Sequence, residues 1–172
     1  MEIPLYPSHQ SACFTGHRNL TEAELRRAVE AITETVPHLV AQGIVHYYAG
    51  GAIGFDLAAA VTVLNLKQTF PQLALTLALP CREHMAQWRR TDRALFSRVM
   101  ERADGVVYVH DTYFRGCMQA RNRYMVDRSA VCLAYLTACR GGTYHTASYA
   151  EKKGIPVMNL AGEIEGEQLR FL

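Results

Sequence analysis

The sequence contains no apolar run of the roughly 18–20 residues that a membrane-spanning helix requires. Residues 1–10 combine neither a basic start nor an apolar centre, so we expect no export signal. Charge of one sign is not in large excess either, because the chain has 18 Lys and Arg and 16 Asp and Glu, which gives a net charge of +2. This balance provides no general attraction to nucleic acid or to an anionic membrane. We therefore expect a cytoplasmic location and no membrane partner, and the charge balance disfavours a nucleic-acid partner.

Cysteine is present, but not in a pattern that builds a disulfide framework or a metal site. The 5 cysteines are an odd number and include no C-x-x-C pair, which fits a reducing compartment. Cys13 and Cys132 lie inside apolar runs, where a thiol behaves as a small buried hydrophobe. No metal site is predicted. Cys81 is expected to be inert, because nothing in the sequence places a base near it.

The chain has the length and the apolar content of one domain. Its 172 residues are 49% apolar and 20% charged, which is enough to bury a core and too short for two well-packed cores. We expect a single domain over residues 1–172, with its core at 11–160. The tail at 161–172 shows little pattern and is expected to pack loosely or fray.

Short apolar runs alternate with longer segments of helical pattern. The runs are nearly continuous in apolar residues, which is typical of strands that are covered on both faces. Strands are predicted at 11–16, 44–49, 73–79, 105–110, 130–136 and 155–160. Helices are predicted within 21–43 and at 54–68, 84–103, 116–128 and 143–153. The alternation predicts an α/β fold, a Rossmann-like three-layer sandwich with a mainly parallel sheet of about six strands.

The first helix has the clearest end signals. Thr21 and Glu24 match a capping box, and Gly43 supplies the stop. Pro37 falls late in the helical pattern. We expect the helix to bend or to be interrupted there, because proline removes a backbone donor and clashes with the preceding turn.

A glycine-rich turn, G-G-A-I-G-F-D, follows the second strand and leads into a helix. Gly50, Gly51 and Gly54 expose backbone N–H groups at a helix start, where the helix dipole favours a phosphate. The turn matches neither a Walker A loop nor the G-x-G-x-x-G fingerprint. Asp56 has two interpretations: it caps or charges the first helical turn, or it accepts a ribose hydroxyl.

A second glycine-rich helix start, R-G-G-T, follows the fifth strand. Two such turns at the carboxyl ends of parallel strands favour a phosphorylated, nucleotide-like ligand, so a bound nucleotide or phosphate is the cofactor that they suggest. The segment T-G-H-R after the first strand adds a sharp turn and a guanidinium for phosphate, although an ordinary surface arginine explains it equally well. The candidate ligand-binding residues are Gly16, His17, Arg18, Gly50, Gly51, Gly54, Asp56, Asn122, Gly141, Gly142 and Thr143.

Three further residues keep two interpretations each. Asn122 is either structural or a contact for the sugar of a nucleotide. Asp111 follows His110 at the end of the fourth strand, but neighbouring strand residues point in opposite directions, which disfavours a direct acid–base pair. Trp88 is expected to anchor a core or an interface, with stacking on a base as the alternative.

Five segments stand out in chain order: T-G-H-R, G-G-A-I-G-F-D, P-C-R, R-N-R-Y-M-V-D and G-G-T. Together, from about residue 11 to residue 160, they resemble the SLOG superfamily of Rossmann-like proteins, and within it the small bacterial YpsA-like family. The superfamily also contains DNA-processing protein A, which binds single-stranded DNA, and the "lonely guy" phosphoribohydrolases, which split nucleoside monophosphates. The resemblance implies a nucleotide-type ligand over the glycine-rich turns, and a homodimer formed through helices that flank the sheet.

The resemblance leaves enzyme activity open. The phosphoribohydrolases carry G-G-x-G-T-x-x-E, whose glutamate supports the reaction, whereas this chain has Thr146 in the place of that glutamate. YpsA-like relatives commonly have an acidic residue in the second helix where this chain has Val61. Asp56 and Asp111 are then the candidate catalytic carboxylates for an N-glycosidic hydrolase or transferase.

Three functional hypotheses result. The first is a cytoplasmic nucleotide-binding protein, a sensor or regulator, in which the glycine-rich turns hold phosphate, Arg18 neutralises charge, and Asp56 or Asn122 contacts the sugar. The second is the N-glycosidic hydrolase or transferase. The third is single-stranded DNA binding, which the near-neutral charge opposes. The residues that motivate the third hypothesis are Arg82, Arg89, Arg90, Arg93 and Arg115.

Overall fold

One sheet of parallel strands forms the centre of the molecule. The computed structural model describes residues 5–162, and within them the sheet has six strands in the order β4-β3-β2-β1-β5-β6, all parallel. The strands are β1 (Ser11–Gly16), β2 (His46–Ala49), β3 (Ala74–Leu79), β4 (Gly105–Tyr108), β5 (Val131–Tyr135) and β6 (Val157–Asn159). The order places the first strand inside the sheet, between β2 and β5.

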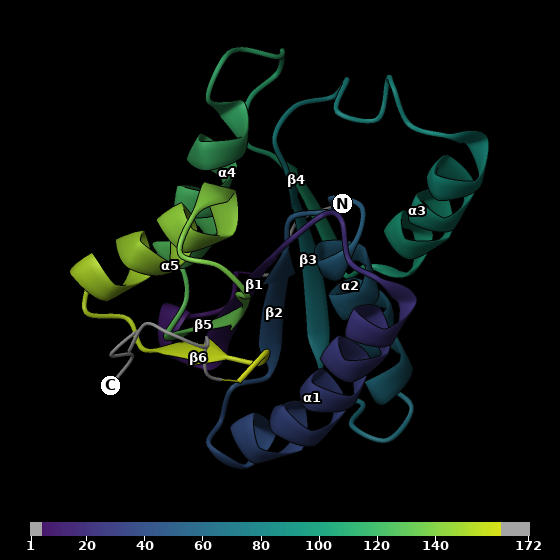
Figure 1. Cartoon of the computed structure of the whole chain (residues 1–172). Helices are drawn as coiled ribbons and strands as arrows, with labels where there is room; N and C mark the ends of the chain where they lie inside the picture. Colours follow the sequence, from purple (N-terminus) through teal and green to yellow (C-terminus); the bar gives the residue numbers. More distant parts are fainter. Residues whose placement is uncertain (1–4, 163–172) are drawn as a thin grey trace.

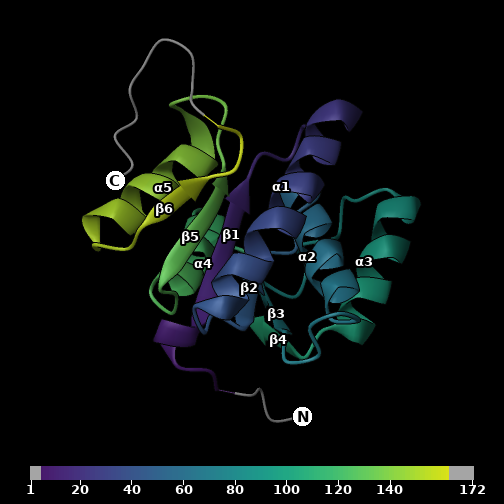
Figure 2. The same ribbon diagram turned by 90° about the horizontal axis from the view of Figure 1, so that it is seen from below.

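Helices cover both faces of this sheet, as Figures 1 and 2 show. The helices are α1 (Glu22–Ala41), α2 (Phe55–Leu66), α3 (Arg90–Arg102), α4 (Cys117–Val126) and α5 (Gly141–Lys152), and a short 3-10 helix, η1 (Ser8–Gln10), precedes β1. The first three helices lie on one face, and α4 and α5 lie on the other. The predicted α/β, Rossmann-like three-layer fold is therefore confirmed, with a sheet that is wholly parallel.

The end signals of α1 act as the sequence predicts. The Thr21 hydroxyl accepts from the Glu24 N–H at 3.2 Å, and the Glu24 carboxylate accepts from the Thr21 N–H at 2.7 Å, which completes the capping box. Gly43 adopts φ 88° and ends the helix in a Schellman motif, in which the Ile44 N–H donates to Leu39 O. Pro37 does not interrupt the helix, because α1 is continuous from residue 22 to residue 41; the alternative, a bend at Pro37, stays a prediction.

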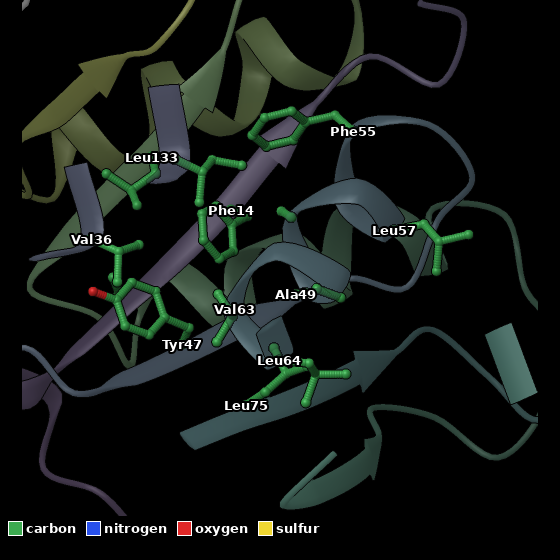
Figure 3. Close-up of a cluster of buried hydrophobic side chains, with 14 of the residues drawn as sticks. Phe14, Val36, Tyr47, Ala49, Phe55, Leu57, Val63, Leu64, Leu75 and Leu133 are labelled. Carbon is green, nitrogen blue, oxygen red and sulfur yellow. The ribbon is translucent and has the colours of Figure 1, made fainter. Parts of the chain in front are cut away.

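The main core lies between the sheet and the helices that cover one of its faces. Strands β1, β2, β3 and β5 contribute to it from the sheet, and α1 and α2 contribute from the helical layer. Figure 3 shows Phe14 of β1, Tyr47 of β2 and Leu75 of β3 directed toward Val63 and its neighbours on α2. The buried positions of α2 surround the helix and do not form one stripe, because the sheet lies on one side of it and α1 and α3 on others. A second cluster under α4 and α5 includes Cys13 and Cys132, which are fully buried as predicted.

Most predicted boundaries lie within two residues of the observed ones, and two of the differences bear on the candidate site. The third helix begins at Arg90 and not at residue 84, because 84–89 form turns in which the Ala86 N–H donates to Glu83 O and the Trp88 N–H to Met85 O. Strand β4 ends at Tyr108, so His110 lies in the following loop. The prediction for the tail falls almost wholly on residues 163–172, which lie outside the described part of the chain. Among the described residues, none of the helices has the length and apolar content that a bilayer crossing needs.

Candidate functional site

The sheet reverses its direction of growth at β1. From β1 the chain adds β2, β3 and β4 on one side, and it then adds β5 and β6 on the other. In open parallel sheets ligands bind beyond the carboxyl ends of the strands at such a reversal. The segments that follow β1, β2 and β5 meet there, and the Thr137 N–H after β5 donates to Nε2 of His17 after β1 at 3.2 Å.

The glycine-rich turn after β2 is packed tightly against the rest of the protein. A Cβ atom on Gly50 would overlap the Arg121 guanidinium, and one on Gly54, which has φ 87°, would overlap the carbonyl of Arg18. The first amide of α2 is also engaged, because the Phe55 N–H donates to His17 O at 3.2 Å. Close packing therefore explains these glycines without a ligand, and their phosphate contact stays a prediction.

Gly16 and Gly51 have packing partners as well. A Cβ atom on Gly16 would overlap the ring of Phe55. Gly51 has φ 68°, and its Cβ would lie 2.7 Å from the side chain of Leu79 and 2.8 Å from the ring of Phe96. The glycines at the ends of β1 and β2 thus allow α2 and the loop after β1 to approach the strand ends closely.

A buried ion pair lies against this turn. Arg121 of α4 reaches over the end of the sheet, where its Nη1 donates to Gly50 O and lies 4.0 Å from Oδ2 of Asp56 on α2. The side chains of Arg121 and Asp56 are 5% and 7% exposed. Burial raises the pKa of the Asp56 carboxyl, while Arg121 and a backbone hydrogen bond from Ala52 oppose that rise. Asp56 is thus held in place by Arg121 and Ala52.

A chain of hydrogen bonds continues from Arg121 to α5. Nε of Arg121 donates to Oδ1 of Asn122 at 2.7 Å, and Nδ2 of Asn122 donates to the Thr146 hydroxyl at 2.9 Å. The hydroxyl in turn donates to Gly142 O at 2.8 Å. We call Asp56, Arg121, Asn122 and Thr146 the polar relay. It connects the two glycine-rich turns, and it occupies both ends of the Asn122 amide.

The start of α5 is open, unlike the turn after β2. Gly141 has φ 84°, and the space around the Cβ positions of Gly141 and Gly142 contains no heavy atom of the described residues within 4 Å. The N-cap residue Arg140 makes no side-chain hydrogen bond to the first turn. Thr143 is 5% exposed and packs inward. The first N–H groups of this helix have no intrahelical acceptor, and Gly141 and Gly142 are exposed.

A small pocket lies over the ends of β2 and β3, beside the ion pair. It is lined by Arg18, Gly50, Ala52, Pro80, His84, Trp88, Met118 and Arg121. The exposed Arg18 extends over Met118, with Nη2 to Sδ at 3.7 Å. Nδ1 of His84 lies 3.1 Å from Cys81 O, and burial lowers the pKa of His84 to about 4. The pocket thus combines guanidinium groups, a neutral imidazole and an indole.

Asp111 lies apart from these groups. It is in the exposed loop between β4 and α4, its side chain is 92% exposed, and its contact is an ion pair with Nε of Arg82 at 3.9 Å. His110 packs edge-on against Phe114 in the same loop. The described part of the chain gathers no cluster of three or more His, Cys, Asp or Glu side chains able to hold a metal ion.

Two members of the site, Arg121 and His84, are missing from the candidate ligand-binding residues, although Arg121 begins the segment R-N-R-Y-M-V-D. Arg121 shares one helical face with Cys117 and Met125, and all three are buried. An arginine at four-residue spacing from two apolar residues is the signal that could have found it. No comparable signal exists for His84, because its place depends on the turn at 84–89.

The parallel sheet, its reversal at β1 and the helices on both faces define a Rossmann-like α/β protein. More narrowly, the family model YpsA, described as "YspA SLOG family", matches residues 13–154. The chain belongs to this family, which confirms the resemblance stated from its motifs.

Relatives in other bacteria are similar over most of this chain. A UPF0398 protein of Halalkalibacterium halodurans is 29% identical over 127 residues, which cover 72% of this chain and 65% of the relative. The SPbeta prophage-derived protein YoqJ of Bacillus subtilis is 26% identical over 147 residues, covering 78% of this chain and 85% of YoqJ. The chain therefore spans just under two thirds of the first of these relatives.

Two solved structures share the fold. DNA processing protein A of Streptococcus pneumoniae superposes with a TM-score of 0.66 at 15% identity, covering 94% of this chain and 52% of that protein. DNA processing protein A of Helicobacter pylori, which binds single-stranded DNA, superposes with a TM-score of 0.62 at 19% identity, covering 87% of this chain and 64% of that protein. At these identities the likeness concerns the fold alone.

Proposed function

We propose that the protein binds a nucleotide or nucleotide derivative across the carboxyl ends of β2, β1 and β5, as a sensor or regulator in the cytoplasm. The phosphate contacts the N–H groups of Gly141, Gly142 and Thr143, and the exposed Arg18 supplies a positive charge. Asp56 and Asn122 act as positioning residues, because Arg121, Ala52 and Thr146 already engage their polar atoms. The predicted homodimer remains a prediction.

The open start of α5 is the observation that carries this proposal. Its N–H groups have no side-chain cap, and the helix dipole adds positive potential there. The loop that bears Arg18 is next to the segment before this helix, since His17 accepts from the Thr137 N–H. The polar relay fixes the same turn from inside through the bond between Thr146 and Gly142 O. An anion at α5 would thus meet a preorganised group of donors.

The test is calorimetric titration with AMP, ADP-ribose and NAD, using Gly142→Asp and its uncharged isostere Gly142→Asn. The space beside Gly142 admits either side chain, and an acidic residue in the first turn favours the helix. We expect Gly142→Asp to lose at least about tenfold in affinity through charge repulsion, and Gly142→Asn to lose much less.

A second pair of variants examines the guanidinium. Arg18→Gln should weaken binding, and the loss should shrink as salt is added. Arg26→Gln is the matched control, because Arg26 is an exposed arginine on α1 whose side chain pairs with Glu22, at 3.5 Å, in an exposed ion pair. Absence of binding to every ligand, with the wild type and Gly142→Asp indistinguishable, would refute the proposed function.

Single-stranded DNA binding is a second candidate, and the fold shared with the DNA-binding protein of Helicobacter pylori favours it. Tyr113 and Phe114 are 66% and 41% exposed in the loop after β4, and aromatic rings next to arginines form stacking platforms for bases. The exposed arginines in the segments that follow β3 and β4 are Arg82, Arg89, Arg90, Arg93 and Arg115. A gel shift with an oligonucleotide should show binding that weakens steeply with salt, and a shift that salt does not change would exclude this mode.

The hydrolase hypothesis has no comparable support. Asp56 is engaged by Arg121, Asp111 is exposed on a different loop, and the Thr146 hydroxyl belongs to the polar relay. Release of free base from nucleoside monophosphates, followed by chromatography, is the measurement that would establish it.

A further inference from the structure

His17 joins three of the segments that meet where the sheet reverses its direction of growth. Its Nε2 accepts a hydrogen bond from the Thr137 N–H at 3.2 Å, so its side chain reaches the segment after β5. Its carbonyl accepts from the Phe55 N–H at 3.2 Å, so its backbone reaches the start of α2. The residue that follows β1 is therefore bonded to the segments that follow β5 and β2.

The bond to Thr137 fixes the protonation state of His17. A backbone N–H only donates, so Nε2 offers its lone pair and Nδ1 carries the proton of the neutral ring. An imidazolium has no lone pair, and its Nε2–H would point at the Thr137 N–H. Protonation of His17 therefore breaks this bond. Burial lowers the pKa of His17 below its ordinary value of 6.5, and the negative charge of Glu24 opposes this change.

Thr137 begins the segment that leads from β5 to the open start of α5. Just before it, Leu136 is fixed by Asn159, whose Oδ1 accepts from the Leu136 N–H at 3.0 Å and whose Nδ2 donates to Leu136 O at 2.9 Å. Beyond the segment, the polar relay fixes the start of α5 from inside. Between these two anchors, the bond from Thr137 to His17 connects the segment to the loop that carries Arg18.

The charged groups around His17 come from several elements. Glu24 of α1 is the group whose charge acts on the ring, and it favours the imidazolium. Arg18 follows His17 directly and Arg140 ends the segment of Thr137, and both arginines are exposed. On α2, Asp56 is buried in its ion pair with the polar relay. Histidine, unlike arginine, changes its charge between about pH 5 and 8, so His17 can respond to mild acid.

We propose that His17 is an acid-sensitive latch of the nucleotide site, which holds residues 137–140 against the loop of Arg18 when its ring is neutral and releases them when its ring is protonated. This inference rests on the proposed function and specifies its regulation. His17 is a positioning residue in this account, because it holds the segment before α5 and does not contact the phosphate. Release of the segment makes the group of phosphate donors less preorganised, so nucleotide affinity falls as the pH is lowered.

Nuclear magnetic resonance tests the latch without a ligand. Over a titration from about pH 8 to about pH 5, the His17 ring and the Thr137 amide should titrate with one midpoint, below pH 6.5. The variant His17→Gln has a side-chain oxygen that accepts from the Thr137 N–H at any pH, so the Thr137 amide should not titrate there. A Thr137 amide that does not follow the His17 ring in the wild type would overturn the latch, whether or not a nucleotide binds.

Calorimetric titration with ADP-ribose tests the effect on binding. Its pyrophosphate keeps the same charge over this pH range, whereas the phosphate of AMP titrates within it. Relative to His17→Gln, the wild type should lose about three- to tenfold in affinity as His17 becomes protonated, which corresponds to one hydrogen bond. The comparison removes the effect of other histidines, such as the exposed His145 on α5. His17→Phe, which keeps a ring without an acceptor, should bind as weakly as the acidified wild type at every pH.

The coupling is reciprocal, so saturating ADP-ribose should move the titration of His17 to lower pH. A move to higher pH would mean that the imidazolium contacts the phosphate, and it would overturn the latch while leaving the proposed function intact. A constant affinity ratio between the wild type and His17→Gln would overturn the latch in the same way. Absence of ADP-ribose binding at every pH would overturn the proposed function and the regulatory role of His17, even if His17 and Thr137 titrate together.

Discussion

Nη1 of Arg121 donates to Gly50 O and lies 4.0 Å from Oδ2 of Asp56, so one guanidinium joins α4, the turn after β2 and the first turn of α2. Both side chains are nearly buried, so the charge of each is compensated mainly by the other and not by water. The pair fixes the end of the sheet at which the candidate pocket and the open start of α5 lie.

Removal of Arg121 should be costly. Arg121→Met leaves the Asp56 carboxylate buried without its cation, and we expect a loss of about 3–5 kcal/mol in the free energy of unfolding, measured with urea. Arg121→Met combined with Asp56→Asn should recover part of that loss, because the unpaired charge is gone. A double variant no more stable than Arg121→Met would contradict this account of the pair.

Gly50 and Gly142 should respond in opposite ways to a methyl group. Gly50→Ala forces a Cβ into the Arg121 guanidinium, and we expect it to destabilise the protein by about 3 kcal/mol. Gly142→Ala adds a methyl group in open space at a helix start, so stability should stay within about 1 kcal/mol of wild type. Thermal and urea unfolding of the two variants compare the two turns, and equal effects would show that their packing does not differ.

Asn122 and Thr146 should be energetically coupled. Asn122→Ala should cost about 1–2 kcal/mol, since it removes the acceptor of Arg121 Nε and the donor to the Thr146 hydroxyl. In a double-mutant cycle with Thr146→Val, we expect a coupling energy of about 1 kcal/mol. A cycle of Asn122→Ala with Thr33→Val is the control. The Thr33 hydroxyl donates to Val29 O within α1, on the other face of the sheet, so this pair should show no coupling. Additive losses for Asn122 and Thr146 would exclude a continuous relay.

Stability should fall as the pH is lowered, because of His46. The ring is fully buried between Ser11 and Thr76, and burial lowers the pKa of His46 from 6.5 to about 4. Between these values the unfolded chain binds the proton and the folded chain does not, so the free energy of unfolding rises with pH from about 4 to about 6.5. The contribution present above pH 6.5, about 3 kcal/mol, is lost as the pH falls to about 4.

The variant His46→Gln should reduce this dependence, measured by urea unfolding at several pH values, and His84, whose pKa burial also lowers to about 4, accounts for part of what remains. The exposed His9→Gln serves as the control for the removal of a histidine. An unchanged slope for His46→Gln would assign the pH dependence to other groups.

The sequence predicts the fold well because its signals are local. The capping box of Thr21 and Glu24 and the stop at Gly43 depend on residues a few positions apart, and the strands are continuous apolar blocks. The start of α3 is predicted too early because the segment 84–89 is held in turns by its own backbone bonds and by packing of His84 and Trp88 on Phe96. Such packing joins residues whose proximity no local pattern encodes.

The site is predicted less completely for the same reason. The sequence identifies both glycine-rich turns, but it cannot distinguish the crowded Gly50 from the open Gly142, because the crowding comes from Arg121, which is 71 positions away along the chain. Asn122 is singled out as a polar residue with two interpretations; its bonds to Arg121 and Thr146 favour the structural one, and a contact with a sugar stays a prediction.

The contrast between the crowded and the open glycine turn also bears on how members of this family diverge. Exchange of residue 50 would displace a buried cation, so selection for folding alone should hold that position constant. Residue 142 is not restricted to glycine by packing, since the space beside it is free. The sequence of the α5 turn can therefore vary without disturbing the packing of the sheet and helices beneath it.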